Sequence, residues 1–281
     1  MSNTYQLIDS GNFQKLEQIG PYRMVRPSPQ AVWRPRLSKA EWKNVDAEFK
    51  RFSGGDGKWF IHNKSMAKNW TINYGGIDIN LKRTDFGHIG LFAEQVENWQ
   101  TIRTLCEGNN YNVLNLFAYT GGSTLAAAQG GAQVVHLDAS KTSVAWAREN
   151  AESNSLSDKP IRWIPDDAQK FVSKELRREK KYHGIILDPP TFGRGTKNEI
   201  WKIEEHLPIL LDSLSEILHD DFKFILLSSH SPGYTPVAMK NNLLEIIDGS
   251  KGTFQLNEML VKEQDSGRAL PSGASCFFIR D

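Results

Sequence analysis

The sequence predicts an α/β fold in which a mostly parallel β-sheet carries helices on both faces. From residue 112 onward, short apolar runs alternate with segments of helical periodicity. The first of these runs enters a glycine turn, and an acidic residue closes the second. We expect this sheet over residues 96–281, after a small N-terminal α+β domain over residues 1–95 that is a candidate for substrate binding.

The N-terminal domain is expected to contain two strands, one helix and a hairpin, in that order. β-Branched and aromatic residues favour the strands. The hairpin is indicated by alternation with period two on both sides of Gly75 and Gly76. The expected segments are strands 5–8 and 22–25, helix 39–52, and hairpin strands 70–74 and 77–81.

In the larger domain, strands alternate with helices, as a parallel sheet requires. The strands are apolar runs too short for helices, whereas the longest helix repeats Ile and Leu at helical spacing. The expected strands are 112–117, 133–138, 161–164, 184–188, 222–227, 254–261 and 276–279, and the expected helices are 123–129, 140–154, 171–181, 200–218 and 241–248.

The turn after the first of these strands, residues 119–124, points to a ligand. Gly121 and Gly122 supply backbone angles that other residues resist, and they permit close approach to the main chain. Asp138 ends the next strand, at the edge where open α/β sheets bind ligands, and its carboxylate can accept hydrogen bonds from both hydroxyls of a ribose. We therefore expect an adenosyl ligand.

Two alternatives to that ligand follow from the same residues. A dinucleotide site would need Gly-x-Gly-x-x-Gly to bring a pyrophosphate onto a helix N-terminus, and this turn lacks that spacing. The other alternative is a structural glycine turn beside a surface aspartate, with no ligand at all.

A second informative segment is Asp188-Pro189-Pro190, at the end of the fourth strand. A residue before proline is held extended and each proline fixes its own backbone angle, so Asp188 and the carbonyls beside it are expected to be rigid acceptors. Alternatively, the strand simply stops at the two prolines. Asp166 and Asp167 follow the third strand, where an adenine amino group would lie.

Composition favours an ordinary globular protein rather than a membrane or disulfide-rich one. No run reaches the roughly 18 to 20 apolar residues of a membrane span, and the first residues show no signal-peptide pattern, so a cytoplasmic location is expected. The two cysteines, Cys106 and Cys276, are far apart in the sequence, which favours neither a disulfide framework nor a cysteine zinc site.

The formal net charge of +1 hides an excess of basic residues at the N-terminus. Residues 1–95 carry 14 Lys and Arg against 9 Asp and Glu, a balance of +5, so the remaining residues carry −4. Between residues 22 and 70 the basic residues are interleaved with aromatic ones, a composition that suits RNA because Lys and Arg neutralise phosphates and aromatic rings stack on bases. The alternative is a small domain with aromatic residues in its core and lysines outside.

Taken together, these motifs resemble the class I S-adenosylmethionine-dependent methyltransferases. The resemblance covers about residues 70–281 and is closest to the bacterial ribosomal-RNA large-subunit methyltransferases, a family that includes 5-methylcytosine and 7-methylguanosine enzymes. The residues that carry it lie in 87–95, 115–122, 135–138, 147–150, 166–168 and 187–190.

The resemblance implies a Rossmann-like seven-stranded sheet whose last strand is antiparallel, S-adenosyl-L-methionine as cofactor, and no metal. The turn would contact the methionine part of the cofactor, Asp138 the ribose and Asp167 the adenine amine. The implied cofactor-binding residues are Gln95, Phe117, Tyr119, Thr120, Gly121, Gly122, Asp138, Ala139, Asp166, Asp167 and Asp188, and the implied catalytic residues are Asp188, Pro189, Pro190 and His230.

The sequence departs from the family's pattern after the fifth strand. Cytosine-5 enzymes have a cysteine there that attacks the base, whereas this chain has Ser228-Ser229-His230-Ser231, so a nitrogen or oxygen target is favoured over cytosine C5, and we expect nitrogen. His230 could accept a proton from the target, although a lone histidine at a strand end is often structural. Thr191 replaces the aromatic residue usual after Pro-Pro in exocyclic-amine enzymes, which would leave base stacking to Phe192.

The sequence therefore predicts an S-adenosylmethionine-dependent methyltransferase of RNA, and ribosomal-RNA processing is its expected context. A homo-oligomer is compatible with it. The alternatives are a methyltransferase with a protein or small-molecule acceptor, and a cofactor-binding module that serves in assembly without transferase activity.

Overall fold

The computed structural model describes residues 3–52, 56–194, 200–247 and 249–281. The chain divides into two compact units. The first unit comprises Met1–Glu94 and Leu260–Ser272, and the second comprises Gln95–Met259 and Gly273–Asp281. Residues 260–272, which the sequence-based division places in the larger domain, thus make their contacts within the first unit. Among the described residues no helix has the length and apolar character to cross a membrane.

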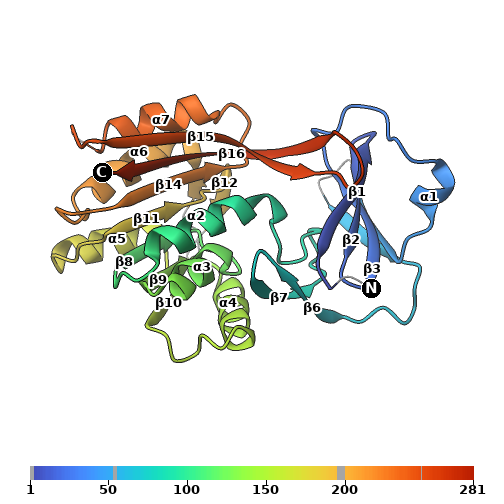
Figure 1. Ribbon diagram of the computed structural model, residues 1–281, viewed down its shortest axis with the longest axis horizontal. Coiled ribbons are helices and arrows are strands. Elements are labelled where there is room, and N and C mark those ends of the chain that lie inside the picture. Colours follow the sequence, from blue (N-terminus) through green and yellow to red (C-terminus); the bar gives the residue numbers. More distant parts are fainter. Residues whose placement is uncertain (1–2, 53–55, 195–199, 248) are drawn as a thin grey trace. The chain divides into compact units, whose positions relative to one another are not determined.

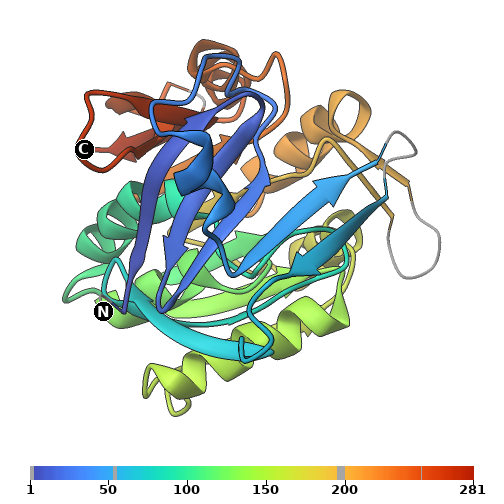
Figure 2. The ribbon, with the colours of Figure 1, turned by 90° about the vertical axis from the view of Figure 1, so that its right-hand side faces the viewer.

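The first unit is built around a five-stranded sheet whose strands follow one another in chain order (Figure 2). All neighbouring pairs described are antiparallel except β3 and β4, which are parallel. A two-stranded hairpin, β6 with β7, confirms the predicted pairing around Gly75 and Gly76. The elements are β1 (Tyr5–Gly11), β2 (Gln14–Ile19), β3 (Tyr22–Pro27), α1 (Lys39–Lys43), β4 (Ala47–Arg51), β5 (Gly57–Ile61), β6 (Asn69–Tyr74) and β7 (Ile77–Lys82).

The predicted helix 39–52 is wrong beyond Lys43. Ser38 caps α1 and forms a reciprocal capping box with Glu41, but the helix ends after five residues. From Ala47 onward burial alternates, with Ala47 and Phe49 inside, which is the pattern of the strand β4. The composition of this segment favours a helix, so the sequence analysis did not detect that the burial pattern becomes that of a strand at Ala47.

The strand β2 was not predicted because it buries a charge. Glu17 lies in the interior, where its two carboxylate oxygens accept hydrogen bonds from Arg26 Nε (2.7 Å) and Nη2 (2.8 Å), and Tyr5 also donates to it (2.9 Å). Burial alone would raise the pKa of Glu17, but Arg26 and Lys15 lower it to about 2. The ion pair ties β2 to β3, and the hydrogen bond of Tyr5 ties β1 to β2.

The second unit contains the predicted seven-stranded sheet, in the order β10-β9-β8-β11-β14-β16-β15 (Figure 1). The pairs from β10 to β14 are parallel and β16 is antiparallel to β14, so the fold prediction is confirmed. The strands are β8 (Asn112–Leu116), β9 (Gln133–Asp138), β10 (Ile161–Pro165), β11 (Gly184–Leu187), β14 (Phe224–Ser229), β15 (Gly252–Lys262) and β16 (Ala269–Arg280).

Helices cover both faces of this sheet. Leu114 and Leu116 of β8 join a core cluster with residues of α5, α6 and α7, whereas Asn115 points the other way and hydrogen-bonds Thr124 of α3. The helices are η1 (Ala93–Gln95), α2 (Val96–Cys106), α3 (Gly122–Gly130), α4 (Lys141–Ser153), α5 (Ala168–Arg177), α6 (Ile203–Ser215) and α7 (Pro236–Leu244). The sequence thus placed most helices but missed α2.

Three helix boundaries differ from the prediction for local reasons. The helix expected over 171–181 begins earlier, because Asp167 caps α5. The one expected over 200–218 begins at Ile203, because β13 (Ile200–Lys202) pairs with β12 (Phe192–Arg194). The one expected over 241–248 runs from Pro236 to Leu244 after its Thr235 cap, and position 248 lies outside the described residues.

Candidate active site

The turn between β8 and α3 has an unusual backbone. Phe117, Tyr119 and Gly121 have φ values of 58°, 47° and 92°, in the left-handed region that residues other than glycine rarely adopt. Such residues persist where their surroundings fix them, and they concentrate at functional sites. Here the turn is fixed by Asn150 Nδ2 of α4, which donates to the Thr120 carbonyl at 2.8 Å.

The two glycines of the turn are required by packing. A Cβ at Gly121 would lie 3.1 Å from Ala147 Cβ, in addition to the strain of the left-handed backbone. A Cβ at Gly122 would lie only 2.4 Å from Trp99 Cζ2. The atoms that leave no room for a side chain belong to α4 and α2, so these glycines let the helices approach the turn and thereby set its course.

Asp138 closes β9 beside this turn. Its Oδ2 accepts a hydrogen bond from Tyr119 N (2.9 Å) and its Oδ1 accepts one from Ser140 N (2.8 Å). Burial raises the pKa of Asp138, and the two backbone donors oppose that shift. A carboxylate offers about four acceptor positions, so two remain after these bonds. Two further acceptor positions on a half-buried carboxylate fit the two hydroxyls of a ribose, and Ala139 follows directly in the chain.

Three buried polar side chains, those of His136, Thr124 and Asn115, form a hydrogen-bonded group next to the turn. His136 of β9 is inaccessible to solvent, and burial lowers its pKa to about 3, so the imidazole is neutral. Its Nδ1 lies 2.9 Å from Thr124 Oγ1, which also accepts a hydrogen bond from Asn115 Nδ2 at 2.8 Å. Sequence reasoning missed this group, because the three residues belong to β8, α3 and β9 and meet only in the folded sheet.

Asp166 and Asp167 lie at the end of β10, as predicted from the sequence. Asp167 Oδ1 accepts a hydrogen bond from Lys170 N (2.9 Å) and so caps α5, while Asp166 bonds Lys174 Nζ at 2.5 Å. Partial burial opposes ionisation of Asp166, but the bond to Lys174 outweighs it and lowers the pKa. The contact of Asp167 with an adenine amine stays a prediction.

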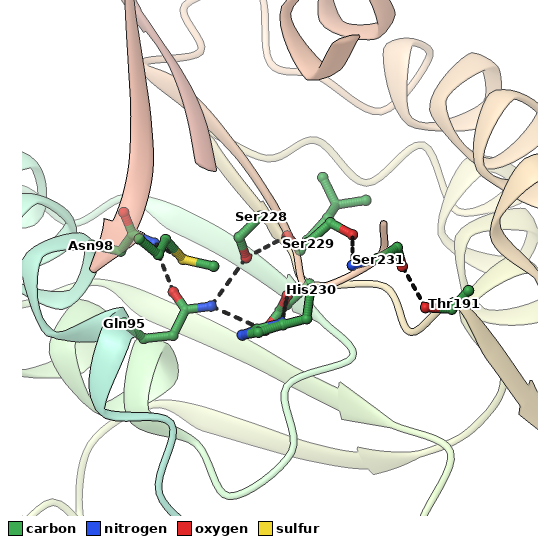
Figure 3. A network of polar contacts seen from close by, with 10 residues as sticks. Gln95, Asn98, Thr191, Ser228, Ser229, His230 and Ser231 are labelled. Atoms are coloured by element: carbon green, nitrogen blue, oxygen red, sulfur yellow. Dashed lines mark hydrogen bonds and ion pairs between the residues drawn. The ribbon is translucent and has the colours of Figure 1, made fainter. Parts of the chain in front are cut away.

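Asp188 follows β11 and accepts a hydrogen bond from Gln95. Gln95 belongs to a network of polar side chains with Asn98 and Ser228 (Figure 3). Gln95 Nε2 donates to Asp188 Oδ2 at 3.1 Å and to Ser228 Oγ at 3.2 Å. Gln95 Oε1 in turn accepts from Asn98 Nδ2 at 2.7 Å, and Ser275 donates to Asn98 Oδ1 at 3.3 Å. Gln95 is only 6% exposed, so the structure places its amide against Asp188 and not in the open.

His230 follows β14 and lies next to Asp188. His230 Nδ1 is 3.4 Å from Asp188 Oδ1, and the side chains are 31% and 27% exposed. Pro189 is buried, and the Pro190 carbonyl accepts a hydrogen bond from Trp201 Nε1 at 2.7 Å, so that carbonyl is engaged within the protein. The predicted catalytic residues therefore come together, with Asp188 and His230 as the groups able to exchange protons.

The site as a whole lies at the carboxyl ends of the parallel strands. The turn follows β8, Asp138 closes β9, the acid pair follows β10, and Asp188 and His230 follow β11 and β14. Parallel strands bring these ends to one edge of the sheet, which is where α/β proteins bind ligands. The edge thus places the turn and the Asp138 carboxylate, which follow β8 and β9, beside the Asp188 carboxylate and the His230 imidazole, which follow β11 and β14.

Known proteins are similar to this chain in sequence and in fold. Residues 50–220 match the family model of the S-adenosylmethionine-dependent methyltransferases. The crystal structure of a SAM-dependent methyltransferase from Agrobacterium tumefaciens is 37% identical, with a TM-score of 0.93 over 99% of this chain and 90% of that one.

Two curated relatives carry the names of ribosomal-RNA enzymes. "Ribosomal RNA large subunit methyltransferase K/L" from Chromohalobacter salexigens is 28% identical over 87% of this chain and 29% of that protein. "Ribosomal RNA large subunit methyltransferase I" from Aeromonas salmonicida is 32% identical over 47% of this chain and 33% of that protein. The chain thus spans about a third or less of the length of these relatives. With a family model that covers more than half of its residues, the chain belongs to the S-adenosylmethionine-dependent methyltransferase family.

Proposed function

We propose that this protein transfers the methyl group of S-adenosylmethionine to ribosomal RNA, at a nitrogen atom and not at cytosine C5. The observation that carries the proposal is the juxtaposition, at one edge of the sheet, of the Asp138 carboxylate with its two remaining acceptor positions and the Asp188 and His230 pair. The bound cofactor supplies an electrophilic methyl group on sulfur, and the protein positions the acceptor against it.

We propose the roles of the residues from the family resemblance, and their places in the sheet support them. The turn at 119–122 is proposed to receive the methionine part of the cofactor, Asp138 its ribose and Asp167 its adenine. Asp188 and Pro189 face the acceptor. Gln95 is proposed to act through Asp188, because its amide is bonded to that carboxylate.

The cysteines support a target other than cytosine C5. Methylation of that carbon needs a nucleophile, ordinarily a thiolate, to form an adduct with the base first. Cys106 and Cys276 are the two cysteines of the sequence, and both are buried. Burial raises the pKa of each thiol to about 12, so neither is a thiolate at neutral pH.

An RNA acceptor is supported by the names of the curated relatives and by one surface of the first unit. Several of the N-terminal aromatic residues serve the fold: Phe49 is buried, and Trp42 donates its indole hydrogen to Asp9. On the outer face of β4 and β5, in contrast, Lys50 lies directly opposite Lys58. Like charges in that position are unfavourable unless an anion binds between them.

The same face presents an aromatic ring. Phe60 of β5 is 37% exposed, and Lys50 Nζ lies 5.3 Å from the centre of its ring, although Glu48 also pairs with this lysine at 3.1 Å. Two cations beside an exposed ring suit a phosphate and a stacked base. We therefore propose the first unit as the substrate-binding part of the protein. The cytoplasm is its proposed location.

The function is tested with methyl-labelled S-adenosylmethionine and ribosomal RNA from a strain that lacks this gene, followed by nucleoside mass spectrometry. We expect one labelled nucleoside, and much less label with Asp138→Ala when the cofactor concentration is limiting. Labelled 5-methylcytosine would refute the nitrogen target. Label in protein or in small molecules would favour another acceptor, and tight cofactor binding without transfer to any acceptor would favour an assembly module.

The RNA surface is tested separately by filter binding at several salt concentrations. Lys50→Glu with Lys58→Glu should weaken binding and reduce the slope of log affinity against log salt by about 2, since each phosphate contact contributes close to one. Lys180→Glu, an exposed lysine of the second unit, is the matched control. An unchanged slope in the double variant would exclude this surface.

A further inference from the structure

Asp188 and His230 follow the ends of two neighbouring parallel strands. β11 and β14 pair in register, with Leu187 opposite Leu227, so the residues that follow them project from the same edge of the sheet. His230 Nδ1 and Asp188 Oδ1 are 3.4 Å apart, and both side chains are about one-third exposed. This spacing suits a carboxylate that orients an imidazole.

The carboxylate is held in one orientation. Its Oδ2 accepts from Gln95, whose amide is fixed in turn by Asn98 and Ser228 (Figure 3). Asp188 also precedes two prolines, which restrict its backbone. The side chain therefore has little freedom to turn away from His230.

The other oxygen of the carboxylate is left for the imidazole. Asp188 Oδ1 is buried and has no hydrogen-bond partner among the described residues, while His230 Nδ1 lies at the edge of hydrogen-bond distance. A buried carboxylate oxygen without a donor is costly, and a hydrogen on His230 Nδ1 would satisfy it. An imidazole protonated on Nδ1 presents Nε2 as a base.

We propose that Asp188 and His230 act as a dyad that takes a proton from the acceptor, so that the methylated nitrogen carries a hydrogen before transfer. This inference rests on the proposed function and narrows its substrate. The acceptor is then an exocyclic amine, or a ring nitrogen of a base that bears a hydrogen. The inference excludes a ring nitrogen such as guanine N7, which has a lone pair and no hydrogen to lose.

The step balances with the groups that are present. The nitrogen lone pair forms a bond to the methyl carbon, the carbon–sulfur bond breaks, and its electron pair returns to sulfur as a neutral thioether. The proton released from the nitrogen goes to His230 Nε2. Asp188 then stabilises the imidazolium, while Gln95 acts as a positioning residue behind the carboxylate.

The dyad is tested first without any substrate. Nitrogen-15 NMR of the neutral histidines, with His230 assigned by the signal lost in His230→Gln, reports which ring nitrogen bears the hydrogen. We expect the hydrogen on Nδ1, and a loss of that preference in Asp188→Asn. A hydrogen on Nε2 in the wild-type protein, or an unchanged tautomer in Asp188→Asn, would overturn the dyad.

Transfer to ribosomal RNA from the deletion strain gives the second test. His230→Gln should slow single-turnover transfer by about 10²- to 10⁴-fold, the usual contribution of a positioned base, with cofactor affinity unchanged within about twofold. His206→Gln, a histidine whose Nδ1 bonds the backbone of Lys202, is the matched control with full activity.

The product distinguishes the two proposals. A nucleoside methylated on an amine or on a protonated ring nitrogen is the expected result. Labelled 7-methylguanosine, or full transfer by His230→Gln, would overturn the dyad and leave the RNA methyltransferase standing. Absence of label in any RNA would instead overturn the proposed function, and the tautomer would still decide whether Asp188 orients His230.

Discussion

Replacement of Asp138 by asparagine tests the cofactor site most directly. In the wild-type protein the two carboxylate oxygens accept from Tyr119 N and Ser140 N and keep two acceptor positions for a ribose. Asparagine keeps the shape but has one oxygen and no charge, and its amide nitrogen faces one of the two backbone donors. The variant therefore loses charge-assisted bonds to the ligand and part of its hold on the turn.

The expected loss of affinity follows from the strength of such bonds. A hydrogen bond to a charged group contributes about 1.5–3 kcal/mol, which corresponds to a weakening of about 10- to 150-fold. Calorimetric titration with S-adenosylhomocysteine measures it. Asp221→Asn removes the same charge from an exposed pair with Lys223 and should leave the affinity unchanged.

The dependence on pH gives an independent check of the same residue. Because burial raises the pKa of Asp138, its ionised form is lost earlier on acidification than that of an exposed aspartate. Affinity for S-adenosylhomocysteine should fall as the pH drops through that raised pKa in the wild-type protein, and this component should be absent in Asp138→Asn. If Asp138→Asn has the melting temperature of the wild-type protein and its affinity for S-adenosylhomocysteine is within threefold of the wild-type value, Asp138 does not hold the ribose.

Three further predictions concern the support of the turn. Gly122→Ala should lower the free energy of unfolding by about 1–3 kcal/mol, because the new Cβ meets Trp99, whereas Gly267→Ala, with no atom within 4 Å of its Cβ, should be neutral in the same thermal melts. The pKa of His136, about 3, lies below that of a histidine in the unfolded chain, so the free energy of unfolding should fall as the pH drops from 6.5 toward 3, with a slope approaching 1.4 kcal/mol per pH unit. His136→Gln should reduce this slope in denaturation curves recorded at a series of pH values. An equal slope in the variant would show that other groups govern the pH dependence. Asn150→Ala removes a buried hydrogen bond to the turn, so melting temperature and cofactor affinity should both fall. If neither changes, the turn keeps its conformation without this bond.

The parts of the fold that were predicted are those whose signal is local. The strand–turn–helix around Gly121 and the ends of the strands at Asp138 and Asp188 are encoded by neighbouring residues, and each lies where it was expected. The segment 47–51 was missed because its strand character depends on which side Phe49 buries. The strand β2 was missed because the partner that makes Glu17 acceptable in the interior lies on another strand.

The same distinction applies to the site. Gln95 was selected from its segment, but its bond to Asp188 joins residues 93 positions apart and needs the folded sheet. Asn150 and His136 lie in segments that carry the family resemblance, but their hydrogen bonds to the turn come from α4 and β9 and form only in the folded sheet. Sequence reasoning thus located the edge of the sheet where chemistry is proposed, and it could not supply the side chains that brace it.

The division of the β15 and β16 hairpin between the two units has a consequence for synthesis. Residues 260–272 belong to the first unit, where Ser10 donates to Glu263 at 2.5 Å and Gln264 N bonds the Leu7 carbonyl. A ribosome delivers residues 3–94 early, but their partners arrive only after the whole parallel sheet has been made. The unit whose translation begins first therefore cannot complete its structure until residues 260–272 have been made, and a fragment that stops at residue 94 should leave Ser10 and Leu7 without these bonds.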